Sequence, residues 1–217
     1  MKSNSKKSIP VFIAVALMLM TATLSSCSAD EELVEKPIAE TYLDEAKKIL
    51  DGTIVLNATA MQGTVNKTLL DEGCPLRYYL KWNDDGTLNM QIREFCVGKM
   101  PLTIWFTIDV KFMQLNTWEK DEYTGDGWIK FQGNGGKTVY TAIDDDYDDG
   151  DGGAGSVTGF LNVKTRQIEF VTNFNVMNMS SDVFLQTVDP SRLSRYEEEF
   201  AQYERDLEEY KRQHGIS

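Results

Sequence analysis

An uninterrupted alternation of apolar and polar side chains from Leu102 to Phe112 restricts the fold more than any other segment of the chain. Every second residue is apolar, and those between are polar apart from Trp105. Successive side chains of a strand point to opposite faces of a sheet, so this pattern predicts a strand with one buried face. The run is long for a strand, and we therefore expect a curved sheet around a deep core.

A hairpin is predicted immediately before this strand. Asn-Asp-Asp-Gly at residues 83–86 is a strong turn signal, with Gly86 suited to the left-handed backbone conformation. The flanking residues, within 76–95, then pair so that their apolar side chains share one face: Trp82 with Leu88, Leu80 with Met90, and Tyr78 with Ile92.

The same register places Cys74 opposite Cys96 at the open end of the hairpin. Side chains approach most closely at such a non-hydrogen-bonded pair, and disulfides persist outside the cytoplasm. We expect a Cys74–Cys96 disulfide that stabilises the fold by about 3 kcal/mol. The alternative is two free buried thiols.

Further strands are predicted on both sides of this hairpin. Residues 53–58 form the first. A second hairpin is predicted from residues 128–132 and 137–143, which flank a glycine-rich turn at 133–136. A third is predicted from residues 157–163 and 168–176, which flank a turn at 164–167 and place Val163 opposite Ile168. Residues 183–188 are predicted to form the last strand. Eight or nine antiparallel strands joined by tight turns predict a mainly β fold, a meander closed into a barrel or a sandwich.

Two helices frame the predicted β-domain of residues 38–188. Apolar residues recur at helical spacing over 38–50, before Gly52. A longer helix is predicted over 189–214, with Asp189 as its cap, Pro190 at its first position and Gly215 after its end. It carries one apolar stripe: Leu193, Tyr196, Phe200, Tyr203, Leu207 and Tyr210. The stripe packs on the domain, or it meets a partner or a second copy.

The N-terminus carries an export signal. Basic residues at 2–7 precede an apolar run from Ile9 to about Ala22, and Leu24-Ser25-Ser26-Cys27 follows. The apolar run is short for a membrane span and typical of a signal peptide. The last four residues resemble a bacterial lipobox, which implies cleavage of residues 1–26 and a lipid anchor on Cys27. Residues 27–37 are predicted to form an acidic tether.

The charge of the chain restricts its partners. Cleavage before Cys27 would remove three lysines and no acid, taking the net charge from −12 to −15. Such acidity argues against binding to nucleic acid, which needs clustered Lys and Arg. Residues 28–32, Ser-Ala-Asp-Glu-Glu, resemble the acidic tether of surface-exported bacterial lipoproteins; the alternative is a solvated linker. The resemblance implies a cell-envelope location, as an outer-membrane lipoprotein exposed at the surface rather than facing the periplasm.

The layout resembles a family of Bacteroidetes lipoproteins with lipocalin-like barrels. The resemblance rests on the lipobox, the short helix, Gly52-Thr53-Ile54 at the first strand, and Gly98-Lys99-Met100-Pro101 before the long strand. It implies a lipocalin-like barrel and little about activity. Ile54 occupies the place of the tryptophan in the Gly-x-Trp motif of lipocalins.

The residues that could carry catalysis are few. The single histidine, His214, lies in the tail, which removes Ser-His and Cys-His nucleophiles and histidine-based metal sites. Asp109 and Glu169 are the acids within predicted strands. A facing pair of this kind could hydrolyse glycosides, but both fall on polar strand faces, where solvated acids are expected.

An acidic segment at 144–152 offers oxygen ligands for Ca²⁺, with Asp144, Asp146, Asp148 and Asp151 as a weak site. It does not fit the EF-hand template, and a solvated loop is the alternative. No other cofactor is expected.

Aromatic side chains outside the predicted core are the best ligand-binding residues the sequence offers. They are Trp105, Trp118, Trp128, Tyr79 and Tyr123. Flat rings stack on sugars and anchor protein partners; the alternative is that the terminal helices cover them. The first hypothesis is therefore a non-enzymatic binding lipoprotein for a glycan, small ligand or protein. The second is an assembly subunit that docks through its C-terminal helix, and the third is an acid-pair hydrolase.

The anchor is testable through its sulfur atom. We expect the Cys27→Ser variant to lose acylation and to move from the detergent phase to the aqueous phase in detergent phase separation. A variant that partitions with envelope material like the parent would contradict the predicted lipidation.

Overall fold

The computed structural model describes residues 38–143 and 150–216. The predicted signal peptide, Cys27 and the tether at 27–37 lie outside these residues. The described elements, in chain order, are α1 (Glu40–Ile49), β1 (Gly52–Gln62), β2 (Val65–Asn66), β3 (Cys74–Trp82), β4 (Leu88–Phe95), β5 (Leu102–Met113), α2 (Glu119–Glu122), β6 (Trp128–Ala142), β7 (Gly150–Asp151), β8 (Gly155–Asn162), β9 (Gln167–Asn173), β10 (Met179–Thr187) and α3 (Arg192–His214).

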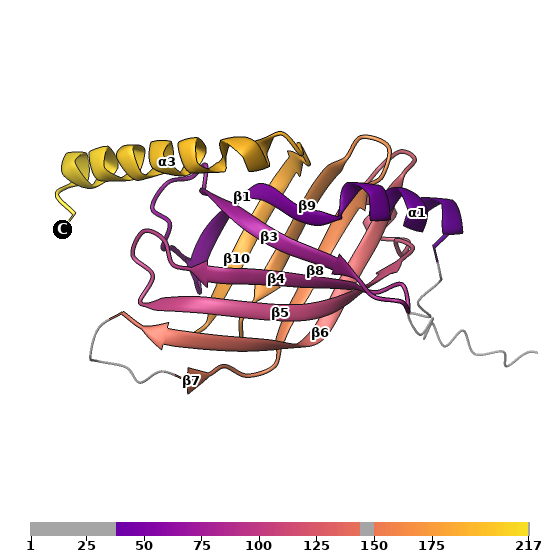
Figure 1. Cartoon of the computed structure of the whole chain (residues 1–217), viewed down its shortest axis with the longest axis horizontal. Helices are drawn as coiled ribbons and strands as arrows, with labels where there is room; N and C mark the ends of the chain where they lie inside the picture. The colour runs from indigo at the N-terminus through magenta and orange to yellow at the C-terminus, as the bar shows by residue number, and fades with distance from the viewer. Residues whose placement is uncertain (1–37, 144–149, 217) are drawn as a thin grey trace, which may run out of the picture. The chain divides into compact units, whose positions relative to one another are not determined.

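The strands form a closed antiparallel barrel, as predicted. Eight of the described strands follow one another around it in the order β10-β9-β8-β6-β5-β4-β3-β1, and β1 pairs with β10 to complete the ring. The short strands β2 and β7 pair at its margins. Helix α1 lies against one end of the barrel, and α3 runs along the outside next to β1 and β3 (Figure 1).

The barrel interior is filled by side chains. A chain of ring contacts crosses it from Tyr78 through Phe170, Phe131 and Phe112 to Trp82, with centroid separations of 5.1 to 5.7 Å. A second group joins Phe174 to Phe95 and Phe106. These contacts leave the inside of the barrel packed like the core of any small domain.

The long strand and the first hairpin are confirmed. Residues Leu102–Met113 form β5, and its alternate residues from Leu102 to Val110 are buried. Strands β3 and β4 pair in the expected register, with Leu80 opposite Met90 and Trp82 opposite Leu88. Asn83 N–H donates to the Thr87 carbonyl (2.9 Å), and Gly86 has φ of 81°. The alternation and the turn chemistry therefore fixed these elements.

The predicted hairpin at 128–143 is wrong. These residues form one strand, β6, which pairs with β5 on one side and β8 on the other. The glycines mark a bend: both ladders are irregular there, and Gly135 has φ of 80°. A Cβ on Gly136 would lie 2.5 Å from the Phe106 ring, so this glycine makes room for the core.

The second predicted hairpin forms with its register displaced by two residues. Ile168 lies opposite Leu161 rather than Val163. The Asn162 side chain starts the turn early, accepting hydrogen bonds from the backbone of Lys164 (2.9 Å) and Thr165 (3.0 Å). A shift of two keeps every side chain on its predicted face, because the side-chain period of a strand is two.

The predicted Cys74–Cys96 disulfide is not formed, and both residues are free thiols. Strand β4 bulges between Ile92 and Phe95, with Glu94 at φ of 52°, so the hairpin ladder does not continue to the two cysteines. Cys74 lies opposite Ala58 of β1 instead. The bulge was not predicted, because no glycine or other residue typical of turns stands at this position in the sequence.

Helix α3 packs on the barrel through its apolar stripe. Tyr203 and Leu207 are buried, and the Tyr203 hydroxyl donates to the Thr68 carbonyl (3.2 Å). The helix begins at Arg192, and Asp189 accepts a hydrogen bond from Ser191 N–H (2.9 Å) just before it. No helix within residues 38–143 and 150–216 is long and apolar enough to cross a membrane.

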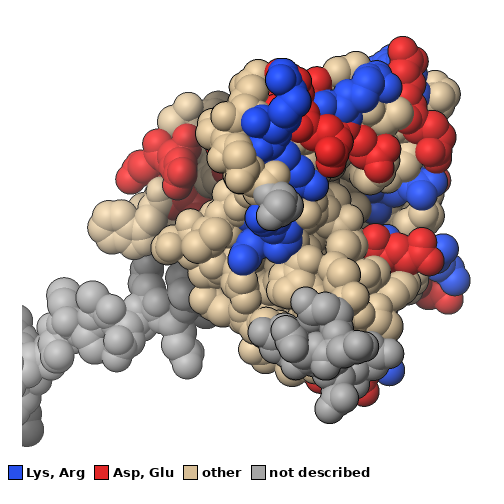
Figure 2. Space-filling view, turned by 90° about the vertical axis from the view of Figure 1, so that its left-hand side faces the viewer, with Lys and Arg blue, Asp and Glu red and all other residues tan. Residues whose placement is uncertain are grey.

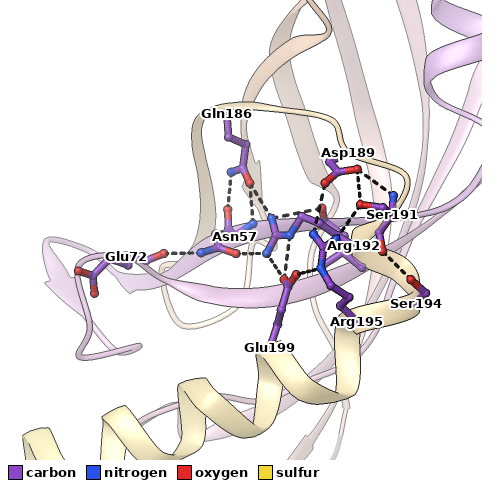
Figure 3. A network of polar contacts seen from close by, with 10 residues as sticks. Asn57, Glu72, Gln186, Asp189, Ser191, Arg192, Ser194, Arg195 and Glu199 are labelled. Atoms are coloured by element: carbon purple, nitrogen blue, oxygen red, sulfur yellow. Dashed lines mark hydrogen bonds and ion pairs between the residues drawn. The ribbon is translucent and has the colours of Figure 1, made fainter.

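The start of α3 fastens the barrel where it closes (Figure 3). β1 and β10 pair from Gln62–Met179 to Thr59–Asp182 and then separate, where β10 is irregular between Val183 and Gln186. Across the gap, the Gln186 side-chain amide bonds the N–H and the carbonyl of Asn57 (2.8 and 2.9 Å). The amide thus takes the place of a backbone peptide in the ladder.

The guanidinium of Arg192 completes this junction. It donates to the side-chain oxygens of Asn57 (2.5 Å) and Gln186 (3.3 Å), and it pairs with Glu199 (2.7 Å). Both partners of the ion pair are largely buried, with side-chain exposures of 17% and 25%. One planar fork therefore links β1, β10 and α3.

Removing the Arg192 guanidinium should destabilise the junction between β1 and β10. We expect Arg192→Ala to lower the free energy of unfolding by about 2 kcal/mol, because it leaves partly buried acceptors and the Glu199 carboxylate short of donors. Chemical denaturation followed by circular dichroism measures it. The matched control is Arg195→Ala, which removes an exposed arginine of the same helix and should cost less than about 1 kcal/mol. Equal losses in both variants would contradict this role.

The two thiols should differ in reactivity. Burial raises the pKa of Cys74 to about 12, so its thiol stays protonated in mildly alkaline buffer. Because the thiolate is the nucleophile, we expect iodoacetamide to label Cys96 before Cys74 in the folded protein and both after unfolding. Peptide mass spectrometry reads the order, and a disulfide-linked peptide would show the structure wrong on this point.

Candidate functional site

A groove lies between the start of α1 and the segment that joins β5 to β6. It encloses about 350 Å³, within the range of small-ligand sites. Residues Tyr42, Leu115, Lys120, Tyr123, Asp126 and Trp128 are among its lining. We call this feature the α1 groove.

The connecting segment is held in place by reciprocal hydrogen bonds. Asn116 N–H donates to the Glu119 carboxylate (2.8 Å), while Glu119 N–H donates to the Asn116 side chain (2.9 Å). Glu119 also pairs with Lys130 of β6 (2.6 Å), with both side chains 16% exposed. This arrangement, equivalent to a capping box, fixes the short helix α2 against the barrel.

Aromatic rings form one side of the α1 groove. Tyr123 stacks on Phe160, with centroids 4.0 Å apart and planes 19° apart, and it lies 5.0 Å from Trp128. The Tyr123 hydroxyl donates to Glu169. Burial, together with the bond to this carboxylate, raises the pKa of Tyr123. The ring is therefore fixed, and its hydroxyl is neutral and already bonded.

A polar trio closes the other side of the groove. Tyr42 of α1 donates to the Asp126 carboxylate, which also pairs with Lys164 from the turn after β8. Lys164, and then Tyr42, hold the pKa of Asp126 below its usual range. Gly127 follows with φ of +99°, and a Cβ there would lie 2.7 Å from the Asn162 side chain. The trio joins three segments that are distant in the sequence.

Two donors in the groove have no partner within the described part of the chain. The Trp128 indole N–H has no acceptor among residues 38–143 and 150–216, and the Lys120 ammonium has no ion pair there. Lys120 is exposed, whereas Trp128 is half-buried. The groove thus combines a flat ring, an indole donor and a cation.

The structure separates the aromatic residues selected from the sequence. It brings Tyr123 and Trp128 together in the groove. Trp118, 81% exposed, belongs to the same connecting segment but does not line the groove. Trp105 and Tyr79 lie on the outer face of β5 and β3. Neither Tyr42 nor Asp126 was selected, since nothing in the sequence relates them.

The predicted acids and metal ligands do not converge on a site. Asp109 of β5 accepts hydrogen bonds from Asn89 (2.8 Å) and Asn83 (3.1 Å). Glu169 of β9 is bonded to Tyr123, and two strands, β8 and β6, lie between β9 and β5. Asp144, Asp146 and Asp148 lie outside the described residues, and Asp151 is exposed on β7. Within the described residues no three His, Cys, Asp or Glu side chains cluster as metal ligands.

The geometry defines a closed eight-stranded antiparallel barrel with a filled interior and an aromatic groove outside it. The chain belongs to the family described as "Domain of unknown function (DUF4903)", whose sequence model matches residues 27–215. No curated protein and no solved structure matches the chain.

Proposed function

We propose that this protein is a non-enzymatic binding module, held in a bacterial cell envelope by lipid on Cys27, whose ligand occupies the α1 groove. The observation that carries the proposal is the contact of Trp128 with Tyr123, together with the Trp128 indole N–H and the Lys120 ammonium, which have no partner among the described residues. Binding pockets characteristically combine apolar or aromatic walls with a few convergent polar groups.

The ligand that suits the groove is small, polar and ring-shaped, such as a mono- or disaccharide. One face of such a ring packs on an indole, and its hydroxyl oxygens accept hydrogen bonds from Trp128 and Lys120. The volume of about 350 Å³ favours a ligand of one or two rings.

Binding is favoured over catalysis by the state of the acid in the groove. Asp126 is already engaged by Lys164 and Tyr42, and its pKa is lowered, which makes the carboxylate a poor proton acceptor at neutral pH. The third hypothesis, a hydrolase using Asp109 and Glu169, has no facing pair to support it.

The envelope location rests on the N-terminal sequence. The family match begins at Cys27, the first residue that would remain after cleavage at the lipobox, which agrees with a mature chain starting there. The assembly hypothesis has less support, because Tyr203 and Leu207 of the α3 stripe are buried, although Leu193 of the same stripe is 43% exposed.

Ligand binding in the groove is testable by tryptophan fluorescence. We expect at least one member of a panel of mono- and disaccharides to change the emission of the full chain in a saturable way. Trp128→Ala should weaken that binding about tenfold or more, as loss of a central aromatic contact does. Intrinsic fluorescence reports the parent, and calorimetry reports the variants.

Trp118→Ala is the matched control, since Trp118 lies on the same segment outside the groove. It should bind like the parent. A panel without a binder, or a Trp128→Ala variant that binds as tightly as the parent, would rule out the groove as the site.

A further inference from the structure

A second surface lies on the outer side of the barrel, and the residues that carry its charge do not line the α1 groove. The outward side chains of β3, β4, β5 and β6 form a continuous sheet face, which we call the β3–β6 face. It is turned toward the viewer in Figure 1, and α3 borders it at β3, where the outward Arg77 lies over the Tyr196 ring and pairs with Glu197. One row of residues runs straight across it: Tyr79, Gln91, Thr107 and Lys137.

Side-chain hydrogen bonds order this face along β4. Arg93 donates to Gln91 (2.9 Å), Gln91 donates to Asn89 (2.9 Å), and Asn89 donates to Asp109 (2.8 Å). Each amide keeps capacity for a further hydrogen bond, since a carboxamide can form about four. The face is therefore a preorganised array of polar groups.

The charge of the β3–β6 face is opposite to that of the chain. Lys81, Arg93 and Lys137 are exposed on it, and none has an ion pair with a described residue. Its outward acid, Asp109, is bonded to two amides, while Glu94 and Asp151 lie at its borders. By contrast, the end of the barrel in Figure 2 carries acidic beside basic side chains. These three cations, and Lys111 exposed further along β5, thus gather on one face of a chain with net charge −12.

Aromatic rings accompany these cations. The Arg93 guanidinium lies over the Tyr79 ring, 4.1 Å from its centroid, which holds both side chains in place. Trp105, half-buried, projects from β5 on the same face, opposite Val139 of β6. Val139, at 36% exposure, is the one large apolar side chain exposed here among the described residues.

We propose that the β3–β6 face binds an acidic polysaccharide. Its carboxylate or sulfate groups pair with Lys81, Arg93 and Lys137, and its sugar rings lie against Tyr79 and Trp105. The row from Tyr79 to Lys137 crosses three interstrand spacings, about 14 Å, so the ligand is a chain rather than a single sugar.

Charge density favours this ligand over the other polyanions. Nucleic-acid binding rests on many phosphate contacts, commonly about 6–10, whereas the few separated cations of this face match a polymer with sparse charge. A lipid surface would be met by several exposed apolar side chains, and the β3–β6 face offers one. Side-chain amides suit the hydroxyl groups between the charges.

The test measures binding of the full chain, purified in nonionic detergent, to polygalacturonate and to dextran sulfate. Methyl-esterified pectin and plain dextran are the uncharged counterparts. We expect binding to at least one of the two acidic polymers, weakening as salt is added, and none to its uncharged counterpart. The polymer that binds identifies a carboxylate or a sulfate as the recognised group.

The variant that removes the three cations is Lys81→Gln with Arg93→Gln and Lys137→Gln, and we expect it to bind about tenfold more weakly or worse. A control with the same change in net charge combines Lys48→Gln, Lys99→Gln and Arg205→Gln, exposed residues outside the four strands of this face. It should bind within a factor of about two of the parent. Circular dichroism verifies the fold of both variants.

Four results would overturn the proposal: no binding to either acidic polymer, equal losses in the two triple variants, undiminished binding by the Lys81–Arg93–Lys137 variant, or tighter binding of a single-stranded oligonucleotide than of both polymers. The Trp128→Ala variant should bind the acidic polymer like the parent, so the outcome here is independent of the groove.

Discussion

The pairing of β1 with β10 is the interaction on which the rest of the structure depends. These strands are the first and last of the barrel, and an unclosed sheet would leave both with unpaired backbone groups. Regular pairing covers only part of their length. Beyond the bulge, hydrogen bonds from the Gln186 amide and the Arg192 guanidinium to Asn57 continue the connection between the two strands. Arg192 belongs to α3. The C-terminal helix is therefore part of the closure, and its stripe packs on β1 and β3 because its first turn is fastened there.

Closure determines where this protein can bind anything. The ring chain from Tyr78 to Trp82 occupies the interior, and glycines such as Gly136 and Gly159 allow Phe106 and Phe131 to lie against the backbone. The closed barrel thus surrounds a core of packed side chains. The two proposed binding sites therefore lie on the outside of the barrel. The segment between β5 and β6 lines the α1 groove, and four strands form the β3–β6 face. Both proposed sites follow from this filled interior.

Local patterns in the sequence predicted the barrel but not its irregularities. Alternation over 102–112 and the turn at Gly86 gave β5 and the first hairpin, since both depend on neighbouring residues. The glycines at 133–136 signal a turn locally, yet tertiary packing uses them to bend one strand. The bulge at Glu94, which keeps Cys74 and Cys96 from pairing, likewise depends on tertiary packing and has no local sequence signal. Half of the α1 groove was foreseeable: Trp128 and Tyr123 stood out as aromatics off the core, whereas Tyr42 meets Asp126 only through the fold.

Amide hydrogen exchange at Asn57, followed by nuclear magnetic resonance, tests the closure most directly. Its N–H is bonded to the Gln186 side chain at the point where regular pairing has ended. A closed barrel predicts that this amide is protected to nearly the same degree as amides of the central strands β4 and β5, opening only with much of the fold. Exchange at Asn57 as fast as in an exposed loop, with β4 and β5 still protected, would show that the barrel is open between β1 and β10.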